Sequence, residues 1–217
     1  MDVGIIGGTG PAGRGLGLRL AEAGMSVGIG SRDAERAARV VGDAVAPWPS
    51  RLAGELRGVA NDEAATAALV VLATPWDSAA TTAAGLADAL AGKVLVSMAN
   101  ALMRQGREML PLVPARGSVA ALVQAAVPRS RVSAAFHHLP AGEMSDLDSG
   151  LIADVLVCSD DPDATAETMS LVERIEGLRP LDAGSLAQAA AIEAFTAVCV
   201  TLNMRHRAHS TLKMAGI

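Results

Sequence analysis

The sequence predicts an α/β protein built on a doubly wound parallel sheet. Short apolar runs alternate with stretches of helical periodicity along most of the 217 residues, and this alternation is typical of parallel strands joined by crossover helices. A glycine-rich turn joins the first apolar run to the first helical stretch. Hydrophobic residues make up 51% of the chain and aromatic residues 2%, so we expect a sizeable core packed by Ala, Val and Leu. A smaller α/β extension is expected at the C-terminal end.

The first thirteen residues carry the most specific motif. Residues 3–6 form an apolar run, and Gly8, Gly10 and Gly13 follow it in the G-x-G-x-x-G spacing. In this context Gly8 allows the tight turn, and Gly10 lets the backbone approach a pyrophosphate. Gly13 lets the next helix, over residues 14–23, sit close to the strand. Because free amides and the helix dipole at that end favour phosphate, we expect a Rossmann dinucleotide-binding fold rather than a glycine turn without a ligand.

The second strand indicates which dinucleotide is bound. It covers residues 25–30 and continues into Ser31 and Arg32, with Arg36 one helical turn further on. An NAD-selective fold tends to place an acidic residue at this strand end, to bind the ribose 2'-hydroxyl. A hydroxyl and two guanidinium groups suit a 2'-phosphate instead, and Asp33 is expected to cap the next helix. The sequence therefore favours NADP, and a solvated basic helix start is the alternative.

The third confident strand points to the nicotinamide end of the site. Residues 42–68 contain loop and helix-start signals without a clear strand, whereas residues 69–73 read as a buried parallel strand. That strand continues into Thr74, Pro75 and Trp76. The ligand crevice of an open α/β sheet lies at the carboxyl ends of its strands, so these residues should face the cofactor. Trp76 is expected either there or packed beneath it.

The rest of the chain continues the alternation and ends in a long apolar helix. The other expected elements are a helix over 78–90, a strand over 93–97, a loop region over 101–117, a helix over 118–126, a strand over 131–136, a strand over 154–158, a helix over 163–176, an extended segment over 179–182 and an apolar helix over 186–204. Asn100 and His137 follow two of the strands on the crevice side, and the loop region is expected in position to close over a ligand. Polar residues inside the last helix favour a buried helix over a membrane span.

Composition narrows the function further. The net charge of -5 argues against a nucleic-acid partner. Cys158 and Cys199 lie in apolar runs, as reduced cysteines of a cytoplasmic protein do, and no signal peptide is visible. His206 and His209 lack a third ligand for a metal. With no Tyr in the chain, the residues at the expected crevice suit hydride transfer between two bound cofactors, which needs alignment more than acid or base groups.

Together these residues resemble the NADPH-dependent coenzyme F420 reductases, also called F420:NADP oxidoreductases. The resemblance covers nearly the whole chain, in blocks at residues 7–10, 13–21, 30–36, 75–76, 93–97, 137–141, 146–148 and 177–184. The last block is the most specific, because no generic dinucleotide fold requires it. The resemblance implies that NADPH and the 8-hydroxy-5-deazaflavin cofactor bind face to face, with hydride moving between the nicotinamide C4 and the deazaflavin C5.

The resemblance also implies roles for particular residues. The pyrophosphate contacts would come from Thr9, Gly10, Pro11 and Ala12, the 2'-phosphate contacts from Ser31, Arg32 and Arg36, the nicotinamide contacts from Trp76, Asn100 and Ala141, and the deazaflavin contacts from His137, Leu139 and Leu212. Residues 1–141 would form the NADP-binding domain. Residues 142–217 would complete the deazaflavin site and supply a homodimer contact, with no metal, membrane or nucleic-acid partner.

Some residues depart from the family pattern. Pro11 lacks an amide hydrogen, which removes one phosphate donor. Residues 98–116 and the second histidine, His138, also differ from that pattern, and they lie where the second substrate would bind. Two alternatives to F420 reduction therefore stay open: an NADPH-dependent reductase of the same fold that acts on a flavin, an imine or another small acceptor, and an NADPH-binding sensor or partner subunit without turnover.

Overall fold

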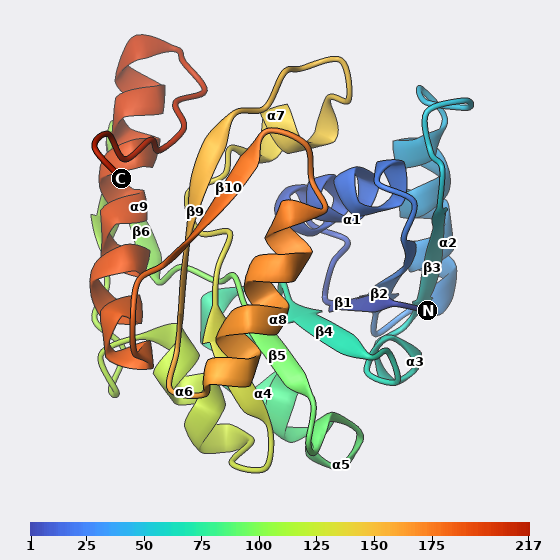
Figure 1. Cartoon of the computed structure of the whole chain (residues 1–217), viewed down its shortest axis with the longest axis horizontal. Coiled ribbons are helices and arrows are strands. Elements are labelled where there is room, and N and C mark those ends of the chain that lie inside the picture. Colours follow the sequence, from blue (N-terminus) through green and yellow to red (C-terminus); the bar gives the residue numbers. More distant parts are fainter.

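The computed structural model describes all 217 residues and contains one eight-stranded sheet in the order β10-β9-β8-β5-β4-β1-β2-β3 (Figure 1). Six strands run parallel: β1 (Val3–Ile6), β2 (Ser26–Ser31), β3 (Glu55–Ala60), β4 (Leu69–Leu72), β5 (Val94–Ser97) and β8 (Arg131–Ala134). Their order is that of a doubly wound dinucleotide fold, which confirms the predicted fold class.

The C-terminal part of the chain extends this same sheet in the opposite direction. Strand β9 (Ala153–Ser159) pairs antiparallel with β8, and β10 (Leu178–Asp182) pairs parallel with β9. The amino end of β9 therefore lies at the edge where the parallel strands have their carboxyl ends. This reversal brings residues from the last third of the chain to the side of the sheet on which the fold binds ligands.

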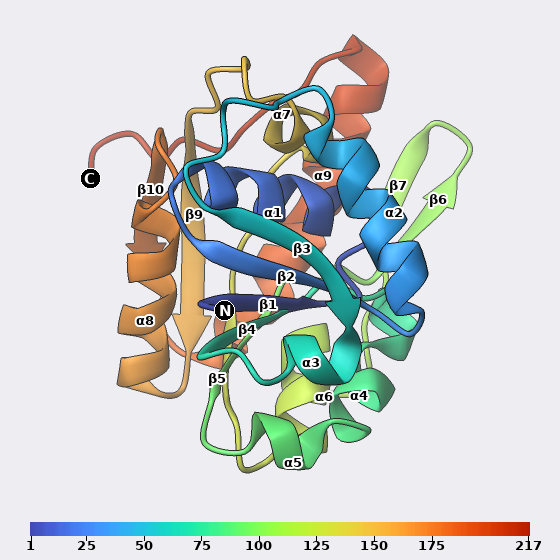
Figure 2. The same ribbon diagram turned by 90° about the vertical axis from the view of Figure 1, so that its right-hand side faces the viewer.

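Helices cover both faces of the sheet (Figures 1 and 2). They are α1 (Pro11–Glu22), α2 (Ala34–Val45), α3 (Asn61–Ala64), α4 (Trp76–Ala84), α5 (Ala87–Leu90), α6 (Val119–Ala126), α7 (Ala141–Ser145), α8 (Pro162–Glu173), a 3-10 turn η1 (Leu186–Gln188) and α9 (Ala189–His206). One buried core lies between the sheet and α1, α2 and α8, and the other lies between the sheet and α3 to α6, with the start of α9.

The strands serve both cores by the alternation of side chains across a pleated sheet. In β4, Val71 belongs to the first core, whereas Val70 and Leu72 belong to the second. In β5, Leu95 and Val96 divide in the same way. Successive strand residues point to opposite faces, so strands covered by helices on both sides must be apolar throughout, and the predicted Val- and Leu-rich runs satisfy this requirement.

Several predicted elements differ in the structure. Residues 42–68 contain the short helix α3, which begins at Asn61 where a helix start was predicted, and the strand β3, which was not predicted. Strand β3 was missed because it is an edge strand with Glu55 and Arg57 on its exposed side. The predicted helix over 78–90 is two helices, α4 and α5. The predicted strand over 131–136 ends at Ala134, because the backbone of Phe136 turns into the left-handed region with φ 66°.

The prediction of a loop over residues 101–117 was wrong. It contains a β-hairpin of β6 (Leu102–Gln105) and β7 (Glu108–Pro111), which stands apart from the main sheet (Figure 2). The hairpin packs on α9, where the Met109 amide donates to Thr201 Oγ1 at 2.9 Å and Arg205 pairs with Glu108. It is thus a part of the α9 layer with its own hydrogen-bonded ladder, rather than a loop.

The long apolar helix predicted over 186–204 forms as η1 followed by α9. The stretch Leu186–His206 is long and apolar enough to cross a membrane by length and composition. In the fold one side of it is buried, including the charged residue Glu193. The other side leaves Phe195, Val198 and Leu202 between 42% and 49% exposed.

Candidate active site

The glycine turn after β1 brings three segments together. Gly7 has φ +67° and is the left-handed residue of the turn. At Gly8, predicted to allow the tight turn, an added Cβ would lie only 2.8 Å from the Ile5 side chain. The Gly8 amide donates to the carbonyls of Ile5 and Gly30, which ties the turn to β2. A Cβ on Gly13 would lie 2.6 Å from the Gly8 Cα, whereas one on Gly10 would meet no atom within 4 Å. The helix therefore approaches the turn closely, as predicted, and open space lies over Gly10.

The amino end of α1 presents free hydrogen-bond donors to that space. The amides of Thr9, Gly10, Ala12 and Gly13 donate no hydrogen bond within the protein. Pro11 stands in the first turn of the helix, where a missing amide hydrogen removes no intrahelical bond. No acidic residue lies in this turn and no side chain caps it. Free amides at the positive end of a helix dipole form an anion site, and Pro11 only reduces the number of donors.

The end of β2 supplies two arginines without ion-pair partners. Arg32 and Arg36 are exposed, and neither lies within 4 Å of a carboxylate. Asp33 does not neutralise them by pairing, because its carboxylate caps α2 and accepts from the Arg36 amide at 3.0 Å, as predicted. Ser31 is buried, and its hydroxyl accepts from the Asp33 amide at 3.2 Å. The strand end therefore keeps two guanidinium groups available for an anion.

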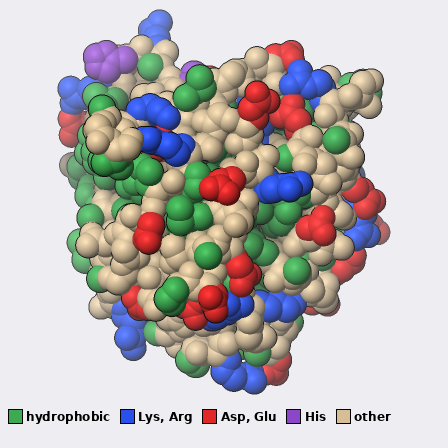
Figure 3. All heavy atoms as spheres, viewed as in Figure 1, with side chains coloured by type: hydrophobic (Ala, Val, Ile, Leu, Met, Phe, Trp, Pro, Cys, Tyr) green, Lys and Arg blue, Asp and Glu red, His purple; other side chains and the backbone are tan.

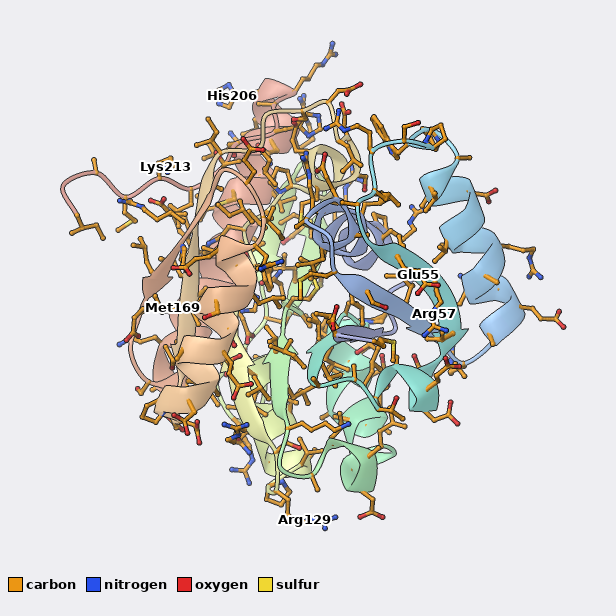
Figure 4. All side chains as sticks on the ribbon, turned by 45° about the vertical axis from the view of Figure 1, so that its right-hand side comes forward. Glu55, Arg57, Arg129, Met169, His206 and Lys213 are labelled. Carbon is orange, nitrogen blue, oxygen red and sulfur yellow. The ribbon has the colours of Figure 1, made fainter.

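The nearby carboxylates of the edge strand β3 and of the helix α3 pair with another arginine. Glu55 and Glu63 lie 3.6 Å and 3.7 Å from Arg57, whose side chain lies on β3 beside Glu55 (Figure 4). Asn61, the first residue of α3, supports the glycine turn, because its Oδ1 accepts from the Gly7 amide at 3.0 Å. Asn61 was not predicted as part of the site. Its position directly after a strand end is the signal, and β3 was not recognised.

Unpaired polar groups lie at the carboxyl ends of β4, β5 and β8, the three parallel strands on one side of β1. Thr74 Oγ1 follows β4, Ser97 Oγ ends β5 and both ring nitrogens of His137 follow β8, and all are buried without a hydrogen-bond partner. A buried polar group without a partner costs stability, so such a cluster is typical of a place where a ligand supplies the partner. Trp76 begins α4 half-buried against the core, and Ser97 was not predicted.

His137 is held as a neutral ring. Burial, and to a smaller extent the neighbouring His138, lower the pKa of His137 to about 3, although the carbonyl of Met98 acts in the opposite direction. Asn100 Nδ2 donates to the His137 carbonyl at 3.3 Å, and the Thr196 hydroxyl on α9 reaches both Asn100 Oδ1 and that carbonyl. The structure thus brings together two predicted residues, Asn100 and His137, with Thr196, which was not predicted.

The adjacent histidine serves packing. His138 Nε2 lies 2.8 Å from the Ile192 carbonyl, and its ring meets Phe195 edge-on, with centroids 5.5 Å apart. Burial lowers the pKa of His138 as well. No group of three His, Cys, Asp or Glu side chains is placed to hold a metal ion. The two neighbouring histidines therefore face different surroundings, and the sequence alone does not distinguish them.

Helix α7 lies across α1 and is fixed there by Arg19 (Figure 1). The Arg19 guanidinium is buried and donates to the carbonyls of Glu143, Asp146 and Ser149 at 2.6–2.9 Å. Ala141 is the first residue of α7, and the buried Leu139 precedes it by two residues. Arg19 therefore fixes the segment that carries both predicted contacts relative to the helix that faces the phosphate space.

Leu212 lies in the tail after α9. Its carbonyl accepts from the Asp154 amide at the start of β9, at 2.8 Å. Asp154 in turn borders the same narrow space as His137, His138 and Leu139. The predicted residues thus fall into two groups on one edge of the sheet: the glycine turn with the β2 arginines, and the residues after β4, β5 and β8 with the tail beside them.

Comparisons with known proteins show the family to which the chain belongs. Residues 2–101 match the model of the family described as NADP oxidoreductase coenzyme F420-dependent. An F420-dependent NADP reductase of Methanocaldococcus jannaschii is 33% identical over 217 residues, which cover 97% of this chain and 96% of that protein. This chain belongs to the F420-dependent NADP reductases.

Further members and structures support the assignment to this family. The F420-dependent NADP reductase of Methanothermobacter marburgensis is also 33% identical, over 100% of this chain and 97% of the relative. The structure of a candidate F420-dependent NADP reductase from Arthrobacter sp. FB24 has a TM-score of 0.81 at 28% identity and covers 99% of both chains. A pyrroline-5-carboxylate reductase from Coxiella burnetii, at 16% identity and a TM-score of 0.60 over 94% of this chain and 68% of that one, shares the fold alone.

Proposed function

We propose that the protein transfers a hydride between NADPH and the deazaflavin coenzyme F420. The observation that carries this proposal is the pairing of two kinds of site on one sheet edge. A set of free amides and unpaired arginines lies at the ends of β1 and β2, and a buried, neutral set of polar groups lies at the ends of β4, β5 and β8. The names of the relatives supply the second substrate.

The first set suits the phosphates of NADPH. Thr9, Gly10 and Ala12 offer free amides to the pyrophosphate, and Pro11 fixes the first turn of α1 without contributing a donor. Arg32 and Arg36 offer guanidinium groups to the 2'-phosphate, and Ser31 adds a hydroxyl beside them. Guanidinium groups bind phosphate by charge-assisted, often bidentate hydrogen bonds.

The second set suits two planar rings placed face to face. Thr74, Pro75, Trp76 and Asn100 would surround the nicotinamide, and Ala141 would lie near its carboxamide. His137, Leu139 and Leu212 would surround the deazaflavin ring. In the reaction, NADPH, F420 and a proton yield NADP⁺ and reduced F420, and the direction depends on the concentrations. The protein contributes alignment and exclusion of water, because neither Asn100 nor the neutral His137 is poised to exchange a proton near neutral pH.

A cofactor screen tests this proposal. Purified protein is mixed with NADPH and, in separate reactions, with F420, FMN or FAD, and the oxidation of NADPH is recorded together with the absorbance of each acceptor. We expect NADPH-dependent loss of the F420 absorbance and slower or no reduction of FMN and FAD. Reduction of FMN or FAD without F420 would favour the flavin alternative. Tight NADPH binding without any turnover would favour the sensor alternative.

We also propose a cytoplasmic homodimer in which α9 forms the contact. The exposed apolar side chains Phe195, Val198 and Leu202 recur on one side of α9, with Met103 of β6 also exposed. Hydrophobic side chains gather on the side of the molecule where α9 lies (Figure 3). Two free cysteines fit a reducing compartment. Light scattering of the wild type and of Leu202→Asp tests the dimer, and a wild type that stays monomeric at high concentration would overturn it.

The two substrates would be bound by successive parts of the chain. Residues 1–141 would bind NADPH, and residues 142–217 would complete the deazaflavin side with β9, β10 and the tail. Competition measurements on variants separate the two roles, because a change on one side should alter the affinity for one substrate only.

A further inference from the structure

The tail after α9 follows a defined path back over the sheet edge. Helix α9 ends at Arg207, whose φ of 50° is left-handed. Further on, His209 packs on α7, because a Cβ on Gly142 would lie 3.5 Å from its ring. The Thr211 hydroxyl then donates to the Ile152 carbonyl at 2.8 Å. The tail therefore runs from the end of α9, past the start of α7, to the amino end of β9.

One buried carboxylate fixes the tail at that point. The side chain of Asp154 is fully buried and accepts from Nε and Nη2 of Arg179 at 2.9 Å and 2.7 Å. It also accepts from Lys213 Nζ at 2.8 Å and from the Met214 amide at 2.6 Å. The Asp154 amide holds the Leu212 carbonyl. Arg179 reinforces the arrangement by donating to the Met214 carbonyl at 2.9 Å.

The position of Asp154 in the sheet relates this cluster to the candidate active site. Strand β9 runs against β8, so Asp154 lies at the ligand edge of the sheet, where it lines a closed gap, too small for a ligand, together with His137, His138 and Leu139. A buried carboxylate with its cations is often no more stabilising than an apolar pair. Here, however, it binds Lys213 and Met214 of the tail directly, and Lys213 projects from that segment (Figure 4).

We propose that Asp154 is a positioning residue that holds residues 210–214, Leu212 among them, as the outer wall of the second-substrate side. The inference rests on the proposed function, and it adds that binding of the second substrate depends on a carboxylate that does not itself contact that substrate. The binding of NADPH, which depends on the glycine turn and the β2 arginines, does not depend on it.

The test uses Asp154→Asn and a matched control. The variant keeps the size of the side chain, and it leaves no buried unpaired cation, because Arg179 and Lys213 are 40% and 50% exposed. Asp88→Asn is the control: it breaks an ion pair with Arg129 at the opposite end of the molecule (Figure 4). Lys213→Ala is a second variant that removes one partner and leaves Asp154 paired with Arg179.

Two measurements separate the tail from the activity. Hydrogen exchange followed by mass spectrometry, without substrates, reports the tail directly, and we expect faster exchange over residues 210–217 in Asp154→Asn only. Steady-state kinetics should then show a KM for F420 raised by about tenfold, the loss of roughly one ordered contact, with the dissociation constant for NADPH unchanged. Lys213→Ala should lie between the wild type and Asp154→Asn in both measurements.

Each outcome decides between explanations. Unchanged tail exchange in Asp154→Asn overturns the proposal, and so does a freed tail with an unchanged KM for F420. A rise in the NADPH dissociation constant equal to the rise in KM indicates general loosening of the fold and also overturns it. If the wild type leaves F420 unreduced, the proposed function is wrong, and Asp154 is then judged by the exchange of the tail alone.

Discussion

The two halves of the site are built in opposite ways. The side that we propose for the phosphates of NADPH, the NADPH side, consists of exposed arginines and free amides from one continuous stretch, residues 7–36. The side that we propose for the nicotinamide ring and the second substrate, the second-substrate side, consists of buried, neutral groups from segments far apart in sequence, with Asn100, His137 and Thr196 joined by hydrogen bonds. A phosphate needs charge and accessible donors, whereas a hydride needs a dry, fixed gap between two rings. The contrast thus follows from what each half must hold.

This difference has a consequence for mutation. Substitutions on the NADPH side should change affinity without changing stability, because the groups there make few internal contacts. Substitutions on the second-substrate side should change stability or tail order as well, because the same groups close the core.

Gly10→Val should abolish NADPH binding and leave the protein folded. The backbone of Gly10, with φ −72° and ψ 167°, is one that any residue adopts, and no atom lies within 4 Å of an added Cβ. The side chain would fill the space over α1 where the pyrophosphate approaches, so we expect a loss of affinity of more than about 100-fold, or about 3 kcal/mol. Calorimetric titration measures the affinity, and thermal unfolding checks the fold.

Gly42→Ala is the control for this variant, because Gly42 also has open space around it but lies inside α2. Its affinity for NADPH should equal that of the wild type. If Gly10→Val binds NADPH normally, the dinucleotide does not pass over the glycine turn.

Glu193, which joins α9 to the start of α6, should make the stability of the fold depend on pH. Glu193 accepts from the amides of Val119 and Ala120 at the start of α6, and burial raises its pKa to about 7, from 4.5, although those amides act in the opposite direction. The folded state therefore holds the proton more tightly than the unfolded state. As the pH rises from 4.5 to 7, the free energy of unfolding should fall, by about 3 kcal/mol at most.

Urea unfolding at pH 5 and pH 8 measures this effect. Glu193→Gln should lose most of the difference between the two pH values, whereas Glu35→Gln, a change at an exposed residue of α2, should keep it. An unaltered pH dependence in Glu193→Gln would show that another group is responsible.

Arg32→Ala should weaken NADPH far more than NADH. The substitution removes a guanidinium that has no partner inside the protein, so stability should not change. The loss of one charged hydrogen-bonding partner predicts a decrease in NADPH affinity of about 10- to 100-fold. Arg39→Ala, one turn beyond Arg36 on the same helix, is the matched control and should have little effect. Equal losses for both dinucleotides would contradict the assignment of Arg32 to the 2'-phosphate.

His137 should leave no mark on the pH profile of the reaction. Its pKa, about 3, lies below the range in which the protein is assayed, so the ring stays neutral between pH 5 and pH 8. When kcat/KM for F420 is measured against pH, the wild type and His137→Asn should therefore have the same profile near pH 6.5. An inflection present in the wild type and absent from the variant would show that the His137 ring gains a proton in the site. The second-substrate side would then be less dry than the structure indicates.

The sequence predicted the local half of the site better than the distributed half. The glycine spacing, the arginines after β2 and the cap by Asp33 are short-range patterns, and the structure confirms the cap and the close approach of α1. Long-range partners leave no such pattern. Arg19 binds Glu143, 124 residues away, and Asp154 holds Lys213, 59 residues away. Each of these residues reads from the sequence as an ordinary charged side chain.

The errors in the predicted elements have local causes. Strand β3 carries Glu55, Arg57 and Gly58, so its periodicity does not resemble that of the buried central strands. The hairpin β6–β7 gains its apolar partner only from α9, more than 80 residues later in the chain. The early end of β8 depends on the left-handed backbone of Phe136. This conformation is rare for an aromatic residue, so the sequence did not predict it.

That single left-handed residue limits how the acceptor preference of such a protein can change. An extended strand would point alternate side chains outward, yet the five residues from Ala135 to Leu139 are all buried. Inserting or deleting one residue there would move every following side chain into a different neighbourhood. New acceptors must therefore be accommodated by replacing side chains in place or by redesigning the tail, while the length of this segment stays constant.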